Sequence, residues 1–400
     1  MSAIVLDGHL KSALSAVRSL GKAGISLSVG AERGTAMALH SRYATSPFTY
    51  PSPLMDRAAF VDAVKREAMH RGGKPLIFAM SDATYLALYE ARAEFEAVAT
   101  LAYPADESVA LAFNKAATYS LAKVSGVPTI PTYESNTEGG VAEIARKLQY
   151  PAVVKPRRSV TWRGAGGSFG TASFAMDEDD LKRLVRTATE RFGEPPLVQE
   201  MVYGEEYGVE MLARSGVPYA RVTHHRIRSL SPKGGASVVK ETLRSGELRS
   251  TLERYAAILV EKLAWNGPIM VEFKVDHDSR TPYLMEVNGR FWGSLPLSVA
   301  ARVDMPLLWY RAVMDGAIPE DVVTGREDVV TGHFLGDVVH LVRVLFARDP
   351  MRPYLYPSRA QALRNFMLLP SGVRADVWSV LDPKPSLMEF VDVIASFLKK

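Results

Sequence analysis

Two short runs of alternating polar and apolar residues carry the side chains with the clearest chemistry. Their polar members are Glu272, Lys274, Asp276, Glu286, Asn288 and Arg290. Side chains in a β-strand alternate between its two faces, so each run is expected to present its polar members on one face. If the turn at residues 277–281 joins the runs as a hairpin, two carboxylates, a carboxamide oxygen and a guanidinium share one surface.

Oxygen ligands of this kind are typical of Mg²⁺, which prefers an octahedral shell completed by phosphate oxygens and water. An antiparallel hairpin with one wet face and one buried face produces the same alternation for purely structural reasons. From these residues alone, a metal site and an ordinary amphipathic hairpin are equally good interpretations.

A glycine-rich segment lies between a strand ending at Lys155 and a strand beginning at Thr171. Its glycines are Gly164, Gly166, Gly167 and Gly170. Glycine lets backbone N–H groups approach phosphate oxygens closely, and the spacing matches neither a dinucleotide fingerprint nor a P-loop. We interpret the segment as a flap over nucleotide phosphates, with Lys155 as a point charge at its root. A surface loop without function is the alternative.

Residues 1–113 alternate between strand and helix patterns. The expected strands are 3–6, 26–29 and 75–80, and the expected helices are 10–20 and 60–71. Such alternation predicts a parallel sheet with helices on both faces. A further helix opens at Ser81 and Asp82, at a strand-to-helix corner. These two residues either contact a substrate or cap the helix.

A second unit begins with the helix 114–125, which has the cap residue Asn114 and ends at Gly126. The helices expected beyond it are 138–148, 177–192 and 247–264, and the strands are 151–155, 171–175, 197–202 and 207–212. Residues 221–242 contain Arg226 and Arg228, which are expected to share a strand face and to bind a carboxylate or γ-phosphate bidentately. Lys240 is a further basic candidate.

The chain becomes helical again from residue 336. Its last helix is expected to start with Ser386 and Glu389 as a capping box. The apolar stripe of this helix comprises Leu387, Phe390, Val391, Ile394, Phe397 and Leu398. Docking of this stripe on the core is favoured over a membrane-surface helix.

The composition bounds these interpretations. The 400 residues, 47% of them hydrophobic, can bury a sizeable core and suggest two or three domains. The formal charge of +4 includes no Lys/Arg block, so no nucleic-acid partner is expected. Neither a membrane-spanning run nor a secretory signal is present, and the absence of cysteine fits a reducing cytoplasm. A homodimer is expected because closed twofold assemblies are common.

Taken in order, these signals resemble the ATP-grasp superfamily. The resemblance is carried by Lys115, Lys155, the run 199–202, Glu206, Glu272 and the run 286–290. The most similar branch includes biotin carboxylase, carbamoyl-phosphate synthase and carboxylate-amine ligases such as D-aspartate ligase. The resemblance covers residues 114–314 and implies an α/β ATP-grasp fold. The implied units are a Rossmann-like domain (1–113), a small lobe with the flap (114–198), a large lobe with the metal and substrate site (199–335) and a mainly helical extension (336–400).

The resemblance also implies roles for individual residues. Those implied to bind ATP are Lys115, Lys155, Gly164, Gly166, Gly167, Glu200, Met201, Val202 and Glu206. Among them, the lysines and glycines would face the phosphates, the run 200–202 would meet adenine, and Glu206 would take the ribose hydroxyls. Those implied to bind Mg²⁺, or Mn²⁺ in its place, are Glu272, Glu286 and Asn288. Those implied to contact substrate or the transferring phosphoryl group are Arg290, Arg226, Arg228 and Lys240.

The implied function is an ATP-dependent carboxylate-amine ligase that forms an amide bond through an acyl phosphate. Its expected substrates are a small-molecule carboxylate and an amine, with amino acids among the candidates. A carbamoyl-phosphate-synthase-like or carboxylase-type enzyme is an alternative, weakened because the chain lacks both cysteine and a biotin attachment segment. A non-catalytic ATP-binding regulatory protein is the alternative from a different class.

Overall fold

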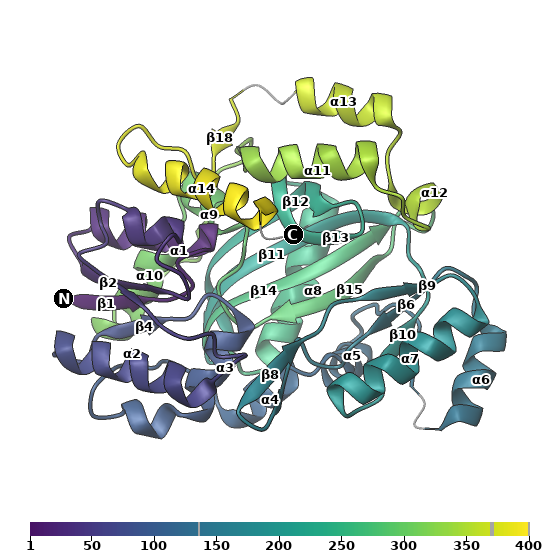
Figure 1. The fold of residues 1–400 in the computed structure, drawn as a ribbon, viewed down its shortest axis with the longest axis horizontal. Helices are drawn as coiled ribbons and strands as arrows, with labels where there is room; N and C mark the ends of the chain where they lie inside the picture. The colour runs from purple at the N-terminus through teal and green to yellow at the C-terminus, as the bar shows by residue number, and fades with distance from the viewer. Residues whose placement is uncertain (135–136, 369–371, 399–400) are drawn as a thin grey trace.

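The computed structural model describes residues 1–134, 137–368 and 372–398. Figure 1 shows a mixed α/β architecture in which a large twisted sheet lies between the N-terminal sheet and a smaller sheet. Helices near the C-terminus cover the upper edge of the large sheet in this view. Among the described residues, no helix combines the length and apolar character needed to cross a bilayer.

The N-terminal sheet is parallel, as the sequence predicts. Its described strands are β1 (Ser2–Val5), β2 (Ser26–Ala31), β3 (Ser46–Thr49) and β4 (Leu76–Phe78), in the order β3-β2-β1-β4. Residues of β1 alternate between a core shared with α1 (Lys11–Lys22) and a core shared with α2 (Arg57–Arg71) and α3 (Asp82–Glu90). The sequence pattern did not reveal β3, an edge strand that contains Pro47, because proline weakens a strand signal and is tolerated only at an edge.

The large sheet runs β15-β14-β11-β12-β13-β17-β18 through the described residues, with β16 beside β12. The strand bounds are β11 (Gly204–Arg214), β12 (Val217–Ser231), β13 (Gly234–Thr242), β14 (Gly267–Asp276), β15 (Pro282–Asn288), β16 (Val323–Thr324), β17 (Val330–Gly332) and β18 (Arg374–Ala375). The helix α8 (Glu247–Lys262) packs its apolar side chains on those of β11 and β14. This packing leaves the other face of these strands for polar side chains.

The predicted hairpin is confirmed at β14 and β15. Glu272 pairs directly with Glu286, and Asn288 lies opposite Met270. Asp276 Oδ1 accepts the N–H groups of residues 278 and 279, so Asp276 shapes the turn instead of joining the polar surface.

The smaller sheet has the order β5-β10-β6-β9 in the described residues. Its strands are β5 (Thr132–Tyr133), β6 (Ala152–Lys155), β9 (Ser173–Ala175) and β10 (Leu197–Gln199), flanked by α5 (Lys115–Val124), α6 (Glu138–Lys147) and α7 (Glu178–Phe192). The glycine-rich segment, expected as one long loop, instead forms the hairpin β7 (Val160–Arg163) and β8 (Gly166–Phe169). The short helix α4 (Asp106–Ala112) precedes α5.

The remaining helices are α9 (Leu295–Ala300), α10 (Met305–Met314), α11 (Phe334–Phe346), α12 (Arg352–Leu355), α13 (Arg359–Met367) and α14 (Lys384–Leu398). The prediction of a capping box in α14 was wrong, because the helix begins at Lys384 and Glu389 pairs with His333 instead. Leu387, Phe390 and Val391 are exposed, so this part of the stripe does not dock on the core. The side chains of residues 394, 397 and 398 lie outside those described.

A buried ion cluster ties the C-terminal segment to the rest of the molecule. Asp376, next to β18, pairs with Lys240 on β13 and with Lys11 on α1, where the Lys11 Nζ to Asp376 Oδ2 distance is 2.8 Å. Burial lowers the pKa of Lys240, and the attraction of Asp376 opposes this effect. Asp376 therefore compensates two ammonium groups that are removed from water.

Replacing Asp376 with alanine should lower the free energy of unfolding by about 3–5 kcal/mol, because two buried lysines lose their counter-charge. Chemical denaturation measures the change. Glu94→Ala removes the exposed partner of Lys65 and should cost less than about 1 kcal/mol. Equal stability losses in the two variants would contradict a structural role for the cluster.

Candidate functional site

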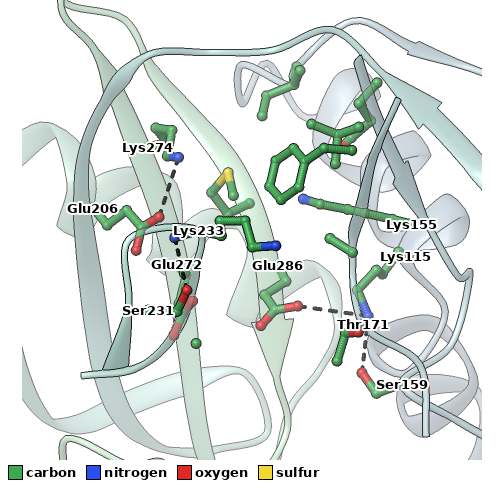
Figure 2. Close-up of a pocket in the computed structure, with 18 of the residues that line it drawn as sticks. Lys115, Lys155, Ser159, Thr171, Glu206, Ser231, Lys233, Glu272, Lys274 and Glu286 are labelled. Carbon is green, nitrogen blue, oxygen red and sulfur yellow. Dashed lines mark hydrogen bonds and ion pairs between the residues drawn. The ribbon is translucent and has the colours of Figure 1, made fainter. Parts of the chain in front are cut away.

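A cavity of about 660 Å³ lies between the smaller sheet and the polar face of the large sheet. Its walls come from β6, the end of β10, the strands β11, β12, β14 and β15, and the loop that joins β12 to β13. Figure 2 shows Glu206 and Glu272 on one side of this space, Lys115 and Lys155 on the other, and Glu286 between them.

Glu206 and Glu272 form the acidic side of the cavity and pair with cations from neighbouring strands. Arg226 Nη2 lies 2.8 Å from Glu272 Oε1, and Arg226 Nη1 lies 2.7 Å from Glu206 Oε2. Lys274 Nζ lies 3.3 Å from the other oxygen of Glu206. Burial alone would lower the pKa of Arg226, but Glu272 and Glu206 outweigh it and the pKa lies above its usual value. Arg226 therefore stays charged.

The two carboxylates that Arg226 joins have different electrostatics. Burial raises the pKa of Glu272 above its usual value, against the attraction of Arg226. Burial also acts on Glu206, but Arg226 and Lys274 together outweigh it and lower the Glu206 pKa. A further cation in the cavity would therefore stabilise Glu272 most, because its charge is the less compensated of the two.

Lys115 reaches the cavity from the first turn of α5. Asn114 caps this helix by accepting the N–H groups of residues 116 and 117, as the sequence predicts. Lys115 Nζ donates to Ser159 Oγ at 3.0 Å and lies 3.7 Å from Glu286 Oε2. The Lys115 ammonium therefore connects Ser159, at the root of the glycine-rich hairpin, with Glu286 in the cavity.

Lys155 enters from the end of β6. Burial lowers its pKa, and Glu286 is the strongest opposing charge. Within the described ranges, its ammonium has neither a hydrogen bond nor an ion pair closer than 4 Å. Desolvation of an unpaired ammonium is costly, so the cavity wall is suited to an anion at this point.

The run Glu200, Met201 and Val202 lines the cavity after β10, and Glu200 Oε1 accepts a hydrogen bond from Tyr133 at 2.8 Å. Apolar side chains lie in the same wall, among them Ile130, Val153, Phe174 and Met285. This part of the cavity is suited to a flat apolar group with polar edges.

Arg290 and Asn288 line the end of the cavity towards the N-terminal sheet. Arg290 Nε donates to Asp82 Oδ1 at 2.6 Å, and Arg290 Nη2 donates to Asn288 Oδ1 at 3.2 Å. Ser81 caps α3, so the capping alternative is confirmed for this residue, while Asp82 lines the cavity and its contact with a substrate stays a prediction.

Gly164, Gly166 and Gly167 of the predicted flap lie outside the cavity in this structure. The Gly167 N–H donates to Leu54 O at 2.8 Å, and Arg57 N–H donates to Ala165 O at 3.1 Å, so the hairpin tip is docked on the N-terminal residues. A Cβ at Gly166 would lie 2.8 Å from Leu54 O. Gly166 and Gly167 thus permit close backbone packing here, while Gly164 forms the turn with a φ of 59°. Gly170 is the glycine of this segment that lines the cavity.

Two predicted substrate residues are not brought to this cavity. A bulge in β12 falls between Arg226 and Arg228, and the Arg228 guanidinium forms a bidentate pair with Asp337 on α11 at 2.7 and 2.8 Å. Lys240 lies beside Arg226 in the sheet, but its ammonium is buried against Asp376. Arg226 and Arg228 both line a neighbouring cavity of about 570 Å³, so the predicted shared face is not contradicted, but Asp337 occupies the Arg228 guanidinium.

Several residues that line the cavity were missed as site residues. Among them are Ser159, Lys233, Lys274 and Arg343. The alternation that picked out Glu272 already places Lys274 on the same face, and Lys233 stands beside the glycine pair of the β12–β13 loop. Arg343 comes from α11, and no local pattern in the sequence marks it.

The residues at the hairpin fit a magnesium ion. Glu272 and Glu286 are cross-strand neighbours, Asn288 is two residues further along, and Asn288 Nδ2 lies 3.4 Å from Glu286 Oε1. In the described part of the chain, no three Asp, Glu, His or Cys side chains are grouped as a metal site. Two carboxylates and a carboxamide oxygen suit an ion that takes its other ligands from phosphate and water.

Comparison with known proteins places this geometry in a fold family. Residues 193–332 match the family model described as ATP-grasp in the biosynthetic pathway with Ter operon. Over 217 residues the chain is 26% identical to the carbamoyl phosphate synthase large chain of Pyrococcus furiosus. That match spans 53% of this chain and 19% of the relative.

Solved structures share the same fold. One is the biotin carboxylase domain of 2-oxoglutarate carboxylase from Hydrogenobacter thermophilus, a dimer solved with MgADP, ADP and bicarbonate. Its TM-score is 0.63, with 17% identity over 82% of this chain and 73% of that one. L-amino acid ligase from Bacillus licheniformis has a TM-score of 0.57 and 18% identity over 80% of this chain and 77% of that one. The predicted α/β ATP-grasp fold is confirmed, and residues 193–332 match an ATP-grasp family model.

Replacing Gly167 with valine should lift the hairpin from the N-terminal residues. A Cβ at this position would lie 2.6 Å from the Trp162 ring and 3.0 Å from the Leu54 side chain. Amide hydrogen exchange should become faster across residues 160–169 and stay unchanged in α8. Gly34→Val, at a position with open space around the added Cβ, is the control. Unaltered exchange in the Gly167 variant would contradict the docking.

Proposed function

We propose that this chain, which has the fold of ATP-grasp ligases, is an ATP-dependent carboxylate-amine ligase that forms an amide bond and releases ADP and phosphate. The observation that carries the proposal is the Lys155 ammonium, which has no ion pair among the described residues and lies across from Glu272 and Glu286 in a cavity that Asn288 also lines. Such a cavity offers cationic groups to phosphate oxygens on one side and metal ligands on the other.

The nucleotide is assigned to the cavity by the chemistry of its walls. The adenine would lie against the apolar wall beside Glu200, Met201 and Val202, with Glu206 as acceptor for the ribose hydroxyls. Lys115 and Lys155 would face the phosphates. The Gly164 to Gly167 hairpin would reach the phosphates only after leaving its docked position on Leu54, which makes its role as a flap a separate proposal.

The reaction has two steps. A carboxylate oxygen of the substrate attacks the γ-phosphorus, and the bond from that phosphorus to the β,γ-bridging oxygen breaks to give ADP and an acyl phosphate. The amine nitrogen then attacks the acyl carbon, phosphate leaves, and the nitrogen loses a proton to solvent. Arg290 and Arg226 spread the negative charge on the transferring group, so the chemistry needs no protein nucleophile. Mg²⁺ held by Glu272, Glu286 and Asn288 would neutralise charge on the triphosphate.

Amino acids are the first substrates to test, because L-amino acid ligase shares the fold. A carbamoyl-phosphate-synthase-like reaction is the second candidate, favoured by the sequence match to the Pyrococcus protein. Homodimer formation and a cytoplasmic location stay predictions. The similar biotin carboxylase domain is a dimer, and the absence of cysteine fits a reducing compartment.

Incubation of the protein with Mg²⁺, ATP and pooled amino acids and other carboxylates should yield ADP and a product lighter by one water than its two substrates. Mass spectrometry and nucleotide chromatography measure both. Release of AMP would contradict the acyl-phosphate scheme, and nucleotide binding without ADP formation from any pool would favour the regulatory protein.

In the same assay, Glu286→Gln should lower turnover more than about 100-fold, because the amide removes a charged metal ligand. Its unfolding curve should match that of the unmodified protein. Glu261→Gln, on the exposed side of α8, is the matched control and should keep full activity. Normal turnover in the Glu286 variant would contradict the metal assignment.

A further inference from the structure

Asp82 belongs to the N-terminal residues, but its carboxylate reaches the cavity of the large sheet. It is the first residue of α3, its side chain is buried, and its Oδ1 accepts the Nε–H of Arg290 at 2.6 Å. The two residues are 208 positions apart. This ion pair therefore connects the N-terminal sheet to the segment that follows β15.

The corner that carries Asp82 is fixed by Asp7, at the end of β1. Asp7 Oδ2 accepts the N–H groups of Met80 at 2.9 Å and Ser81 at 3.0 Å, and the hydroxyl of Thr84 at 2.7 Å. Asp7 Oδ1 accepts the Ser81 hydroxyl at 3.1 Å. These bonds hold the β4 to α3 turn in one conformation, so the direction of the Asp82 side chain is set by the N-terminal sheet.

Arg290 is held at three points. Besides the bond to Asp82, its Nη1 donates to Phe291 O at 2.9 Å and its Nη2 donates to Asn288 Oδ1 at 3.2 Å. A guanidinium has five N–H groups, so two are left for a ligand. Because three of its N–H groups are already bonded, the guanidinium is held in place before any ligand binds.

We propose that Asp82 is a positioning residue, which holds the Arg290 guanidinium so that its two remaining N–H groups face the phosphoryl group transferred in the cavity. The proposal rests on the proposed ATP site. It gives the N-terminal residues a part in the reaction, because their sheet sets the angle of an arginine beside the metal ligands.

Other carboxylates are within the same cavity as Arg290. Glu286 and Glu272 line it together with Asp82. Without Asp82, the guanidinium would turn towards Glu286 and Glu272. It would then compete with the metal ion and no longer face the phosphoryl group.

The position of Arg290 can be observed without any turnover. In the ¹⁵N spectrum, the Nε–H of an arginine bonded to a buried carboxylate should exchange slowly with water and give a separate signal. This signal, assigned by its loss in Arg290→Lys, should be present in the unmodified protein and absent in Asp82→Ala. Its absence from the unmodified protein, or its persistence in Asp82→Ala, would overturn the proposal.

Nucleotide affinity tests the direction of the guanidinium. Asp82→Asn and Asp82→Ala should weaken binding of the Mg²⁺ complex of a non-hydrolysable ATP analogue by about tenfold, while affinity for MgADP, which lacks the γ-phosphate, should change less than about twofold. Calorimetry measures both. Asp106→Asn, which removes the exposed partner of Arg92 in the same N-terminal part of the chain, is the control and should alter neither.

The outcomes separate this proposal from the proposed function. Equal loss of ADP and ATP-analogue affinity in the Asp82 variants would show a merely structural role and overturn the positioning claim, as would unchanged affinity for both. If the unmodified protein binds neither nucleotide, the proposed function fails. In that case the claim about phosphoryl transfer falls with it, even where the Arg290 signal is present.

Discussion

The direct cross-strand pairing of Glu272 with Glu286 is the constraint on which the site depends. Carboxylates opposite each other in a sheet repel, and the repulsion grows as water is removed. The protein compensates with cations from separate elements, Arg226 from β12 and Lys115 from α5. β12 and α5 must both meet the hairpin for the folded chain to keep Glu272 and Glu286 together in a cavity. The arrangement of these elements therefore compensates the repulsion between the two carboxylates.

A few polar contacts join the N-terminal residues to three segments that lie far along the chain. The hairpin tip bonds to Leu54, Asp82 bonds to Arg290, and Asp376 bonds to Lys11. Each contact links residues that are more than 100 positions apart in the chain. The N-terminal residues therefore contribute to the site through Asp82, although most residues that line the cavity belong to the middle of the chain.

Local patterns predicted the parts of the site that depend on local rules. Alternation placed Glu272, Glu286 and Asn288 on one face, and helix-cap signals located α5. The failures have non-local causes. Asp337 holds Arg228 across 109 residues of sequence, Asp376 holds Lys240 across 136, and Leu54 accepts the backbone that we expected over phosphates. A periodic pattern carries no information about a partner that lies far along the chain. For the same reason, the sequence did not mark Arg343 as a cavity residue and left Asp82 with two interpretations.

Manganese titration followed by electron paramagnetic resonance tests the central claim most directly. If Glu272, Glu286 and Asn288 bind a divalent ion together with nucleotide phosphates, ADP must tighten Mn²⁺ binding, and Mn²⁺ must tighten ADP binding by the same factor. The account predicts a reciprocal gain of about tenfold or more, which corresponds to about 1.4 kcal/mol of coupling. Mn²⁺ affinity that is the same with and without ADP would contradict it.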